Sequence, residues 1–221
     1  MNNSIGNAAR VLGAGLRTLL VLTLVCGVIY PLLVTGVAQA LFHPQANGSE
    51  AKSGGKVVGS TLVGQRYDLP LKKGEDTPAP DLKWFQPRPS GGLGTNSVNT
   101  RYKLILSGAT NRSGDDTELI QWVKDAKAAV VKDNSTADFT VRPRDVPADA
   151  VTSSGSGLDP DISPQYAELQ VHRVAEKNGL AVAEVRKLVD DHTTGRTLGF
   201  MGEPRVNVLQ LNVALRDLVR G

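Results

Sequence analysis

The stretch LLVLTLVCGVIYPLLVTGVAQALF, residues 19–42, decides how this chain is organised because it is almost continuously apolar. No Lys, Arg, Asp or Glu occurs between Thr18 and Ser49. At about 1.5 Å of rise per residue the stretch makes roughly 36 Å of helix, enough to cross a hydrocarbon core of ~30 Å with some tilt. The sequence therefore predicts a transmembrane helix over residues 18–42, preceded by a short N-terminal segment, 1–17.

Charges on either side of the apolar stretch predict its orientation. Arg10 and Arg17 precede it, and the first acidic residue, Glu50, follows it. By the positive-inside rule a short basic N-terminus stays in the cytoplasm. We therefore expect a single-pass protein of the cell membrane, surrounded by the lipid bilayer, with residues from about His43 onward on the extracytoplasmic side.

A cleaved signal peptide is the competing interpretation of the same segment. It has basic residues in front and a small-residue pattern, Ala38-Gln39-Ala40, of the kind that signal peptidase recognises. However, the apolar run is longer than the ~7–15 residues of a signal peptide, and residues 31–37 remain apolar where a polar region is expected. These differences favour a retained membrane anchor.

Small residues in the anchor indicate a possible packing face. Pro31 and Gly36 are tolerated in a spanning helix when a neighbouring helix provides partners for the freed backbone groups. Gly27, Gly36 and Ala40 would let such a helix approach closely. Glycine is also simply common in membrane helices, so the pattern leaves both interpretations open.

The part beyond the membrane is nearly neutral. Two of the 25 Lys and Arg residues precede the anchor, which leaves 23 against 22 Asp and Glu. No basic stripe stands out, so the charge does not indicate a nucleic-acid-binding protein. The single cysteine, Cys26, lies in the anchor, so the external part carries no disulfides and must be stabilised by packing.

The external part reads as one α+β domain. Residues 43–56, rich in Gly, Ser and Asn, predict a tether before a domain that spans 57–221. Residues 57–67 are rich in β-branched side chains and predict a strand, whereas 68–100 are rich in Pro and Gly and predict a long loop.

Helices are predicted mainly in the second half of the chain. Apolar residues at helical spacing predict one over residues 115–131. Ser163-Pro164 and Asn178-Gly179 bound a second helix as its N-cap and C-cap signals, and residues 182–192 predict a third. Residues 139–142 predict a short strand. Residues 204–219 fit either a strand or a helix, and their length favours helix.

The sequence contains parts of known catalytic and ligand-binding motifs but no complete motif. None of the three histidines, His43, His172 and His192, has a second His or a Cys at ligand spacing, so no zinc signature is present. The Ser-Gly run at residues 153–157 lacks the glycine spacing and the lysine of a phosphate-binding loop. Asp159 and Asp161 flank a proline and favour a rigid turn before the following helix.

Two functional interpretations of these fragments remain open. An anchored hydrolase would use Ser156, His192 and Asp159, and it predicts that the protein alone turns over ester or phosphate substrates. Arg196 and Arg205, in a second Gly-rich loop, could bind a carboxylate in bidentate fashion, although solvated loop arginines are the simpler interpretation. No nucleophile, base and oxyanion donor assemble convincingly, so the residues favour a protein that is not an enzyme by itself.

Several long blocks resemble the KdpC family, the C subunits of the bacterial high-affinity potassium-transporting P-type ATPase. The blocks occur in the family's order and span nearly the whole chain: YPLLVTGVAQALF at residues 30–42, Pro44 to Ser49, Gly59-Ser60 with Leu62 to Gln65, WFQPRPS at 84–90, TSSGSGLDPDISP at 152–164 and HTTGRTLGFMGEPRVN at 192–207. One region departs from the family pattern. Residues 107–114 replace a typical Ser-Gly-Gly-Ser-Asn-Leu-Gly run, and residues 99–106 before them are also unusual, which puts any family role of that loop in doubt here.

The resemblance implies a non-catalytic accessory subunit of a bacterial cell-membrane complex. Its partners would be a potassium-conducting subunit and a P-type ATPase subunit, with a small membrane subunit as a further candidate. The complex would use ATP and potassium, and we expect no cofactor or metal on this chain. The family is thought to assemble or stabilise the complex and has been proposed to raise the ATP affinity of the catalytic subunit. An external domain cannot meet cytoplasmic ATP directly, so we expect assembly and stabilisation, with the domain resting on the potassium-conducting subunit.

The candidate contact residues come from the blocks that resemble the family. They are Tyr30, Pro31, Gly36, Gln39, Gln65, Arg88, Ser156, Gly157, Asp159, Arg196, Arg205 and Asn207. The main alternative is an anchored or secreted external binding module unrelated to transport, for which a mature N-terminus at Leu41 would be the sign.

Overall fold

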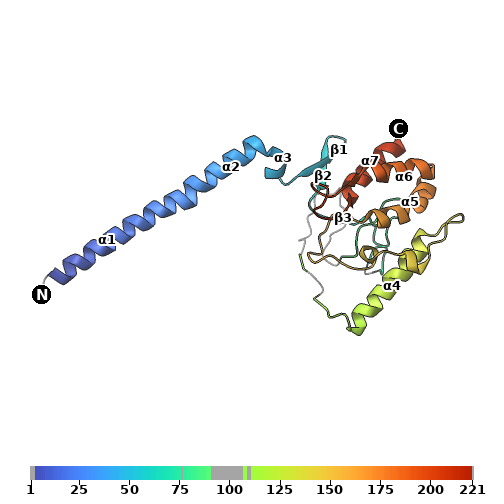
Figure 1. Ribbon diagram of the computed structural model, residues 1–221, viewed down its shortest axis with the longest axis horizontal. Helices are drawn as coiled ribbons and strands as arrows, with labels where there is room; N and C mark the ends of the chain where they lie inside the picture. The colour runs from blue at the N-terminus through green and yellow to red at the C-terminus, as the bar shows by residue number, and fades with distance from the viewer. Residues whose placement is uncertain (1–2, 76, 91–106, 109–110, 221) are drawn as a thin grey trace. The chain divides into compact units, whose positions relative to one another are not determined.

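The computed structural model describes residues 3–75, 77–90, 107–108 and 111–220. The chain divides into two units, residues 1–49 and 50–221. Figure 1 labels the elements of each unit. The parts of the predictions that concern residues 91–106 and 109–110, including most of the divergent region, lie outside the described residues.

The described part of the first unit is mostly helical. It contains α1 (Asn3–Leu24), the π-helical turn η1 (Val25–Ile29), α2 (Tyr30–Leu41) and α3 (His43–Ala46). Among the described residues one helical stretch, Ile5–Leu41, is long and apolar enough to span a membrane. It begins earlier than the predicted 18–42 because helical geometry continues unbroken through Arg10 and Arg17.

The π-helical turn lies directly before Pro31, which explains its position. Proline has no N–H to donate to the helix ladder, and its ring crowds the carbonyl four residues earlier. The ladder shifts by one residue there, and the N–H of Tyr30 bonds to the carbonyl of Val25. A proline in the middle of an apolar helix thus changes the hydrogen bonding locally and leaves the helix continuous.

Residues 43–56, predicted as a tether, contain the short helix α3, the strand β1 and the first residue of β2. The side chains of Gln39 and Asn47 bond to each other, at 3.3 and 3.1 Å, around α3. The strands β1 (Glu50–Ser53) and β2 (Lys56–Ser60) then pair as an antiparallel hairpin. Gly54 and Gly55 both have positive φ, +56° and +77°, which a two-residue hairpin turn requires. The glycines therefore form a tight turn rather than a flexible tether.

The second unit is an α+β domain, as predicted. Its helices are α4 (Thr117–Asn134), α5 (Pro164–Asn178), α6 (Val182–Asp191) and α7 (Val208–Arg220), with short 3-10 turns η2 (Pro143–Asp145) and η3 (Ala148–Ala150). A small antiparallel sheet joins β3 (Asp161–Ile162), β5 (Arg205–Asn207) and β4 (Thr193–Thr194) in the order β3-β5-β4. In Figure 1, α5, α6 and α7 lie together, and α4 extends along another side.

Local signals account for the helix ends. The Ser163 hydroxyl accepts a hydrogen bond from the N–H of Tyr166 at 3.0 Å, and Gly179 ends α5 in the left-handed conformation at φ +68°. Asp116 caps α4 by accepting from two backbone N–H groups.

The segment 204–219, which fits either a strand or a helix by sequence, contains both, because β5 is followed directly by α7.

Two predicted strands differ from the structure. The strand predicted over residues 57–67 ends at Ser60, where the chain turns and the N–H of Val63 bonds to the Ser60 carbonyl. The segment 139–142, predicted as a strand, pairs with no strand among the described residues, and the Val141 N–H bonds to the Ser135 hydroxyl. β-branched composition alone does not supply a neighbouring strand to pair with.

Three buried polar side chains hold the segment 82–88, which turns at residues 82–84 and then continues without helix or strand, against the helices. We call Gln170, Arg173 and Asn212 the polar clamp. Asn212 accepts from the Phe85 N–H and donates to the Phe85 carbonyl, both at 2.9 Å, as a neighbouring strand would. Gln170 pairs with the backbone of Gln86 in the same way, at 2.7 and 3.1 Å. Phe85 is thereby fixed in the core, where its side chain is fully buried.

Arg173 completes the clamp from within the core, where only 1% of it is exposed. It donates to the Leu82 carbonyl, to the Trp84 carbonyl at 2.9 Å and to the Gln170 side chain at 2.6 Å. Its Nε donates to Asn134 at the end of α4, at 2.9 Å. Burial lowers the pKa of Arg173 to about 10, which leaves the guanidinium charged at neutral pH.

Replacing Asn212 tests how much the polar clamp contributes to the stability of the domain. Asn212→Leu would leave the N–H and C=O of Phe85 buried without partners, and we expect the free energy of unfolding to fall by about 2–4 kcal/mol. Urea unfolding of the full chain in detergent, followed by tryptophan fluorescence, measures this change. Gln210→Leu, at an exposed position of the same helix, is the matched control. Equal unfolding free energies for the two variants would contradict the role of the clamp.

Candidate functional site

The loop 152–162, between η3 and α5, is the centre of a cluster built from four of the sequence blocks. Arg88 reaches into it from the segment 82–88. Its guanidinium donates to the carbonyls of Thr152 and Ser153, at 3.4 and 3.3 Å, and forms an ion pair with Asp159 at 3.2 Å. Two of the predicted site residues, Arg88 and Asp159, are therefore in direct contact.

The Ser-Gly turn of this loop is held by its backbone. Gly157 has φ +68°, which favours glycine, and a Cβ there would lie 2.9 Å from the Gly108 carbonyl. The Ser90 hydroxyl donates to the carbonyl of Gly157, and the Gly108 N–H donates to the carbonyl of Ser156 at 2.9 Å. The carbonyls of both predicted residues, Ser156 and Gly157, are thus used to bind neighbouring segments.

Asp161 organises the other end of the loop. It forms an ion pair with Arg205 at 3.0 Å and accepts a hydrogen bond from Asn207 at 3.0 Å. Asn207 also donates to the Thr61 carbonyl at 2.9 Å. Burial raises the pKa of Asp161, with a smaller contribution from the nearby charge of Asp159, while Asn207 and Arg205 act in the opposite direction.

The fourth block packs against the loop by close backbone approach. The N–H of Gly64 bonds to the Leu158 carbonyl at 2.8 Å, and a Cβ on Gly64 would lie 2.6 Å from the Asp159 carbonyl. Gln65 donates to the Val58 carbonyl at 3.0 Å and fills the space beside Gly59. Neither glycine position leaves room for a larger residue.

The structure does not bring all the predicted residues together. Seven of them form what we call the motif cluster: Gln65, Arg88, Ser156, Gly157, Asp159, Arg205 and Asn207. Arg196 lies apart on the following loop, where it pairs with Glu203 at 2.7 Å. The remaining four, Tyr30, Pro31, Gly36 and Gln39, belong to the other unit.

The geometry does not support the hydrolase interpretation, because its three proposed residues are not bonded to one another. The Ser156 hydroxyl accepts from the Leu158 N–H at 3.1 Å, and Nδ1 of His192 lies 2.9 Å from the Leu188 carbonyl. Asp159 is engaged by Arg88. These three side chains therefore bond locally rather than to one another. Within the described part of the chain, no group of three or more His, Cys, Asp or Glu side chains is placed to hold a metal ion.

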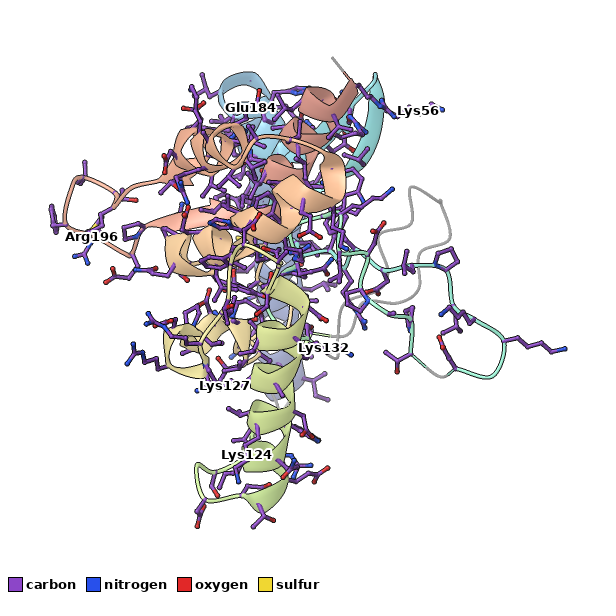
Figure 2. The ribbon with its side chains drawn as sticks, turned by 90° about the vertical axis from the view of Figure 1, so that its right-hand side faces the viewer. Lys56, Lys124, Lys127, Lys132, Glu184 and Arg196 are labelled. Carbon is purple, nitrogen blue, oxygen red and sulfur yellow. The ribbon has the colours of Figure 1, made fainter. Side chains whose placement is uncertain are left out.

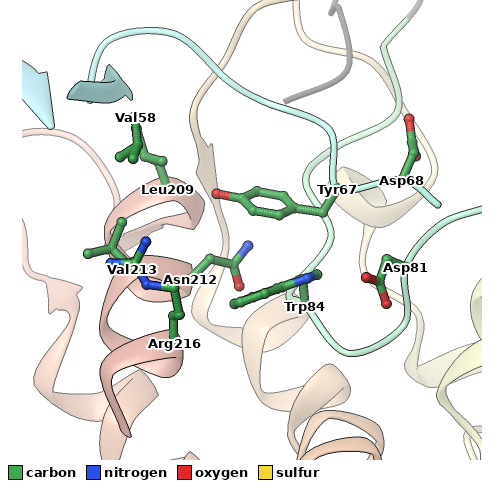
Figure 3. Close-up of a pocket in the computed structure, with 9 residues that line it drawn as sticks. All are labelled: Val58, Tyr67, Asp68, Asp81, Trp84, Leu209, Asn212, Val213 and Arg216. Carbon is green, nitrogen blue, oxygen red and sulfur yellow. The ribbon is translucent and has the colours of Figure 1, made fainter. Parts of the chain in front are cut away.

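A small pocket lies beside the polar clamp, between β2, residues 67–84 and α7 (Figure 3). Its volume is about 190 Å³, below the ~300 Å³ at which pockets for drug-sized ligands begin. The rings of Tyr67 and Trp84 form one wall, with centroids 5.8 Å apart, and face Leu209 and Val213 of α7. The pocket is mainly apolar and contains none of the predicted site residues.

Sequence reasoning missed the polar clamp, although a signal existed. Gln170 and Arg173 lie three residues apart on a helix whose neighbouring positions Val171 and Val174 are apolar, and Asn212 follows Leu211 in the same way. A polar residue on the apolar face of a helix needs a partner when it is buried. Here the partners are backbone groups of a loop more than 80 positions away in sequence.

The fold and the motif cluster define a class of protein. Its members combine an α+β domain, whose motif residues bond to neighbouring segments, with a candidate membrane helix, of which the described residues contain one. The family model described as "K+-transporting ATPase, c chain" matches residues 12–217. The chain therefore belongs to the KdpC family of K+-transporting ATPase subunits.

Curated relatives agree with the family model over nearly the whole length. A protein of Streptomyces avermitilis called "Potassium-transporting ATPase KdpC subunit" is 77% identical over 219 residues, covering 99% of both chains. One of the same name from Streptomyces coelicolor is 73% identical, covering 99% of this chain and 97% of its own. Another from Gemmatimonas aurantiaca is 47% identical over 207 residues, covering 92% of each.

Removing the arginine of the motif cluster should loosen its central loop. Arg88→Met deletes three contacts to residues 152–159, and we expect amide hydrogen exchange at residues 153–159 to become about tenfold faster because that loop opens more readily. Exchange detected by mass spectrometry measures it. Arg144→Met, at a side chain that is 74% exposed, serves as the control. Unchanged exchange in the Arg88 variant would show that the loop holds its shape without this arginine.

The raised pKa of Asp161 predicts a pH effect on stability. The folded domain binds this proton more tightly than the unfolded chain, so the contribution of Asp161 is full below about pH 4 and is lost as the pH rises through the folded-state pKa. Asp161→Asn cannot titrate. The stability of the variant relative to the parent should therefore improve between about pH 4 and pH 6.

Urea unfolding at the two pH values measures this difference. Thr140→Asn, at an exposed residue with no titratable side chain, is expected to show no such trend. A relative stability of the Asp161 variant that falls as the pH rises would mean that the ion pair with Arg205 outweighs burial.

Proposed function

We propose that this chain is a non-catalytic accessory subunit of a potassium-transporting ATPase complex in the bacterial cell membrane, where it assembles and stabilises a potassium-conducting subunit and an ATP-hydrolysing subunit. The observation that carries this proposal is the match of the whole chain to KdpC subunits, at up to 77% identity among the relatives reported above. The names of these relatives refer to potassium transport, and we propose the same role for this chain.

The geometry of the motif cluster supports a structural role. Arg88, Asp159 and Asn207 bond to other parts of the same domain, so they maintain the shape of a surface rather than wait for a substrate. A surface held in one conformation loses less entropy when it binds a partner. Such a surface suits stable contact with another subunit.

The expected orientation of the chain in the membrane argues against direct nucleotide binding by the α+β domain. Arg10 and Arg17 lie on the N-terminal side of the uncharged run, and by the positive-inside rule they favour an N-terminus in the cytoplasm and an α+β domain outside. In that orientation ATP would be on the other side of the membrane from the domain. An effect of the chain on nucleotide affinity would then be a coupling free energy transmitted through the partner subunits.

Co-purification with partner subunits tests the proposal. We expect the full chain, produced together with the two large membrane subunits, to remain bound to both through detergent extraction. Omitting the chain should lower potassium-stimulated ATPase activity, because the remaining subunits assemble poorly. The readouts are the subunit ratio after size-exclusion chromatography and the rate of phosphate release with and without potassium.

Adding back the full chain provides the control, since it should restore both the assembly and the activity. A chain that elutes alone, together with an ATPase that is indifferent to its omission, would contradict the proposal. The intact mass of the co-purified chain is a further check. A mature N-terminus at Leu41 would instead favour a secreted binding module.

A further inference from the structure

The loop between β4 and β5 presents apolar side chains to solvent. Its tip reads Leu198-Gly199-Phe200-Met201, and the exposed fractions of Leu198, Phe200 and Met201 are 78%, 70% and 47%. We call these three side chains the apolar tip. Figure 2 shows the loop that carries Arg196 projecting away from the rest of the domain. Large apolar side chains gathered on a projecting loop are unfavourable in water and commonly mark an interaction site.

The loop is held in one shape at its neck. Arg196 and Glu203 form an ion pair across it at 2.7 Å. Thr197 and Met201 exchange two backbone hydrogen bonds, at 2.9 and 3.0 Å. The apolar tip is therefore presented by a closed turn.

The backbone of the tip adopts a conformation that is unfavourable for its residue. Leu198 has φ +55°, in the left-handed region that leucine rarely occupies, and the next residue, Gly199, has φ +82°. Strain of this kind persists only where the surrounding structure enforces it, and it is concentrated at functional positions.

The base of the loop is anchored in the motif cluster. Thr193 and Thr194 pair with Val206 and Arg205 in the sheet, and Arg205 is bound to Asp161. The tip therefore moves with the rigid part of the domain.

We propose that the apolar tip inserts into an apolar socket on another subunit of the same complex. This inference rests on the proposed function, and it names the contact that would carry the assembly. Phenylalanine and methionine are enriched in the cores of protein interfaces. A closed and strained turn is pre-organised for a socket of matching shape.

A protein socket explains the loop better than a lipid surface does. Insertion into a bilayer requires apolar area but no particular loop shape, and it is strengthened by unpaired basic residues near anionic lipids. Here the basic residues at the neck and base, Arg196 and Arg205, are each paired with a carboxylate. The paired neck instead matches the polar rim that surrounds an apolar interface core.

The first experiment replaces the tip in the full chain produced with its partner subunits. In the double variant Leu198→Ser with Phe200→Ser, we expect dissociation from the purified complex to become about tenfold faster or more, because central apolar contacts dominate interface energies. Leu71→Ser, at another exposed leucine, should dissociate at the parent rate. The conservative variant Phe200→Leu should retain most of the binding. Thermal unfolding of each variant alone should be unchanged, because the tip is exposed.

The second experiment identifies the occupant. A photo-reactive benzoyl-phenylalanine at position 200 of the assembled complex should form a covalent adduct with a partner subunit. Adducts only with lipid, or none to any subunit, would overturn the inference. A complex that assembles normally with the double Ser variant would overturn it too, while leaving the proposed function intact. If the parent chain itself fails to co-purify, it is the proposed function that fails.

Discussion

The domain depends on three buried polar side chains that pair with backbone groups as a neighbouring strand would. The segment 82–88 turns at residues 82–84 and belongs to no helix or strand, so its buried backbone groups need partners from elsewhere in the described part of the chain. Arg173 supplies donors to two of its carbonyls, and the side chains of Gln170 and Asn212 pair with both backbone groups of Gln86 and Phe85. The clamp thus adds hydrogen bonds to the apolar contacts by which Phe85 shares one core with α5 and α7.

One member of the motif cluster, Arg88, lies on the segment that the clamp holds. Arg88 and Ser90 follow directly after the clamped residues, and both bond to the loop 152–162. That loop in turn leads through β3 to β5 and to the base of the loop with the apolar tip. One buried polar network thus supports the groups that contact solvent, and the conformation of the surface follows from the conformation of the core.

Signals local in sequence predicted the parts of the structure that local physics controls. The apolar run predicted a helix that is long and apolar enough to span a membrane, and the Ser163 and Gly179 caps predicted both ends of α5. The α+β class followed from the same patterns. The hairpin β1–β2 was missed because Gly54-Gly55 is equally typical of a tether and of a tight turn. The clamp was missed because its partners are distant in sequence. The motif cluster could be named residue by residue from the family blocks, but which residues touch depended on tertiary packing. Arg196, for example, shares a block with Arg205 yet lies apart from the cluster.

The pairing of Phe85 with Asn212 spans 127 positions of the chain. This separation has a consequence for the order in which the domain forms. The segment near residue 85 leaves the ribosome long before α7 does, and until α7 arrives the segment has only part of its hydrogen-bonding partners. The complete pairing of this segment therefore has to follow the synthesis of α7, because the entropic cost of closing so long a loop is met only when the distant contact forms.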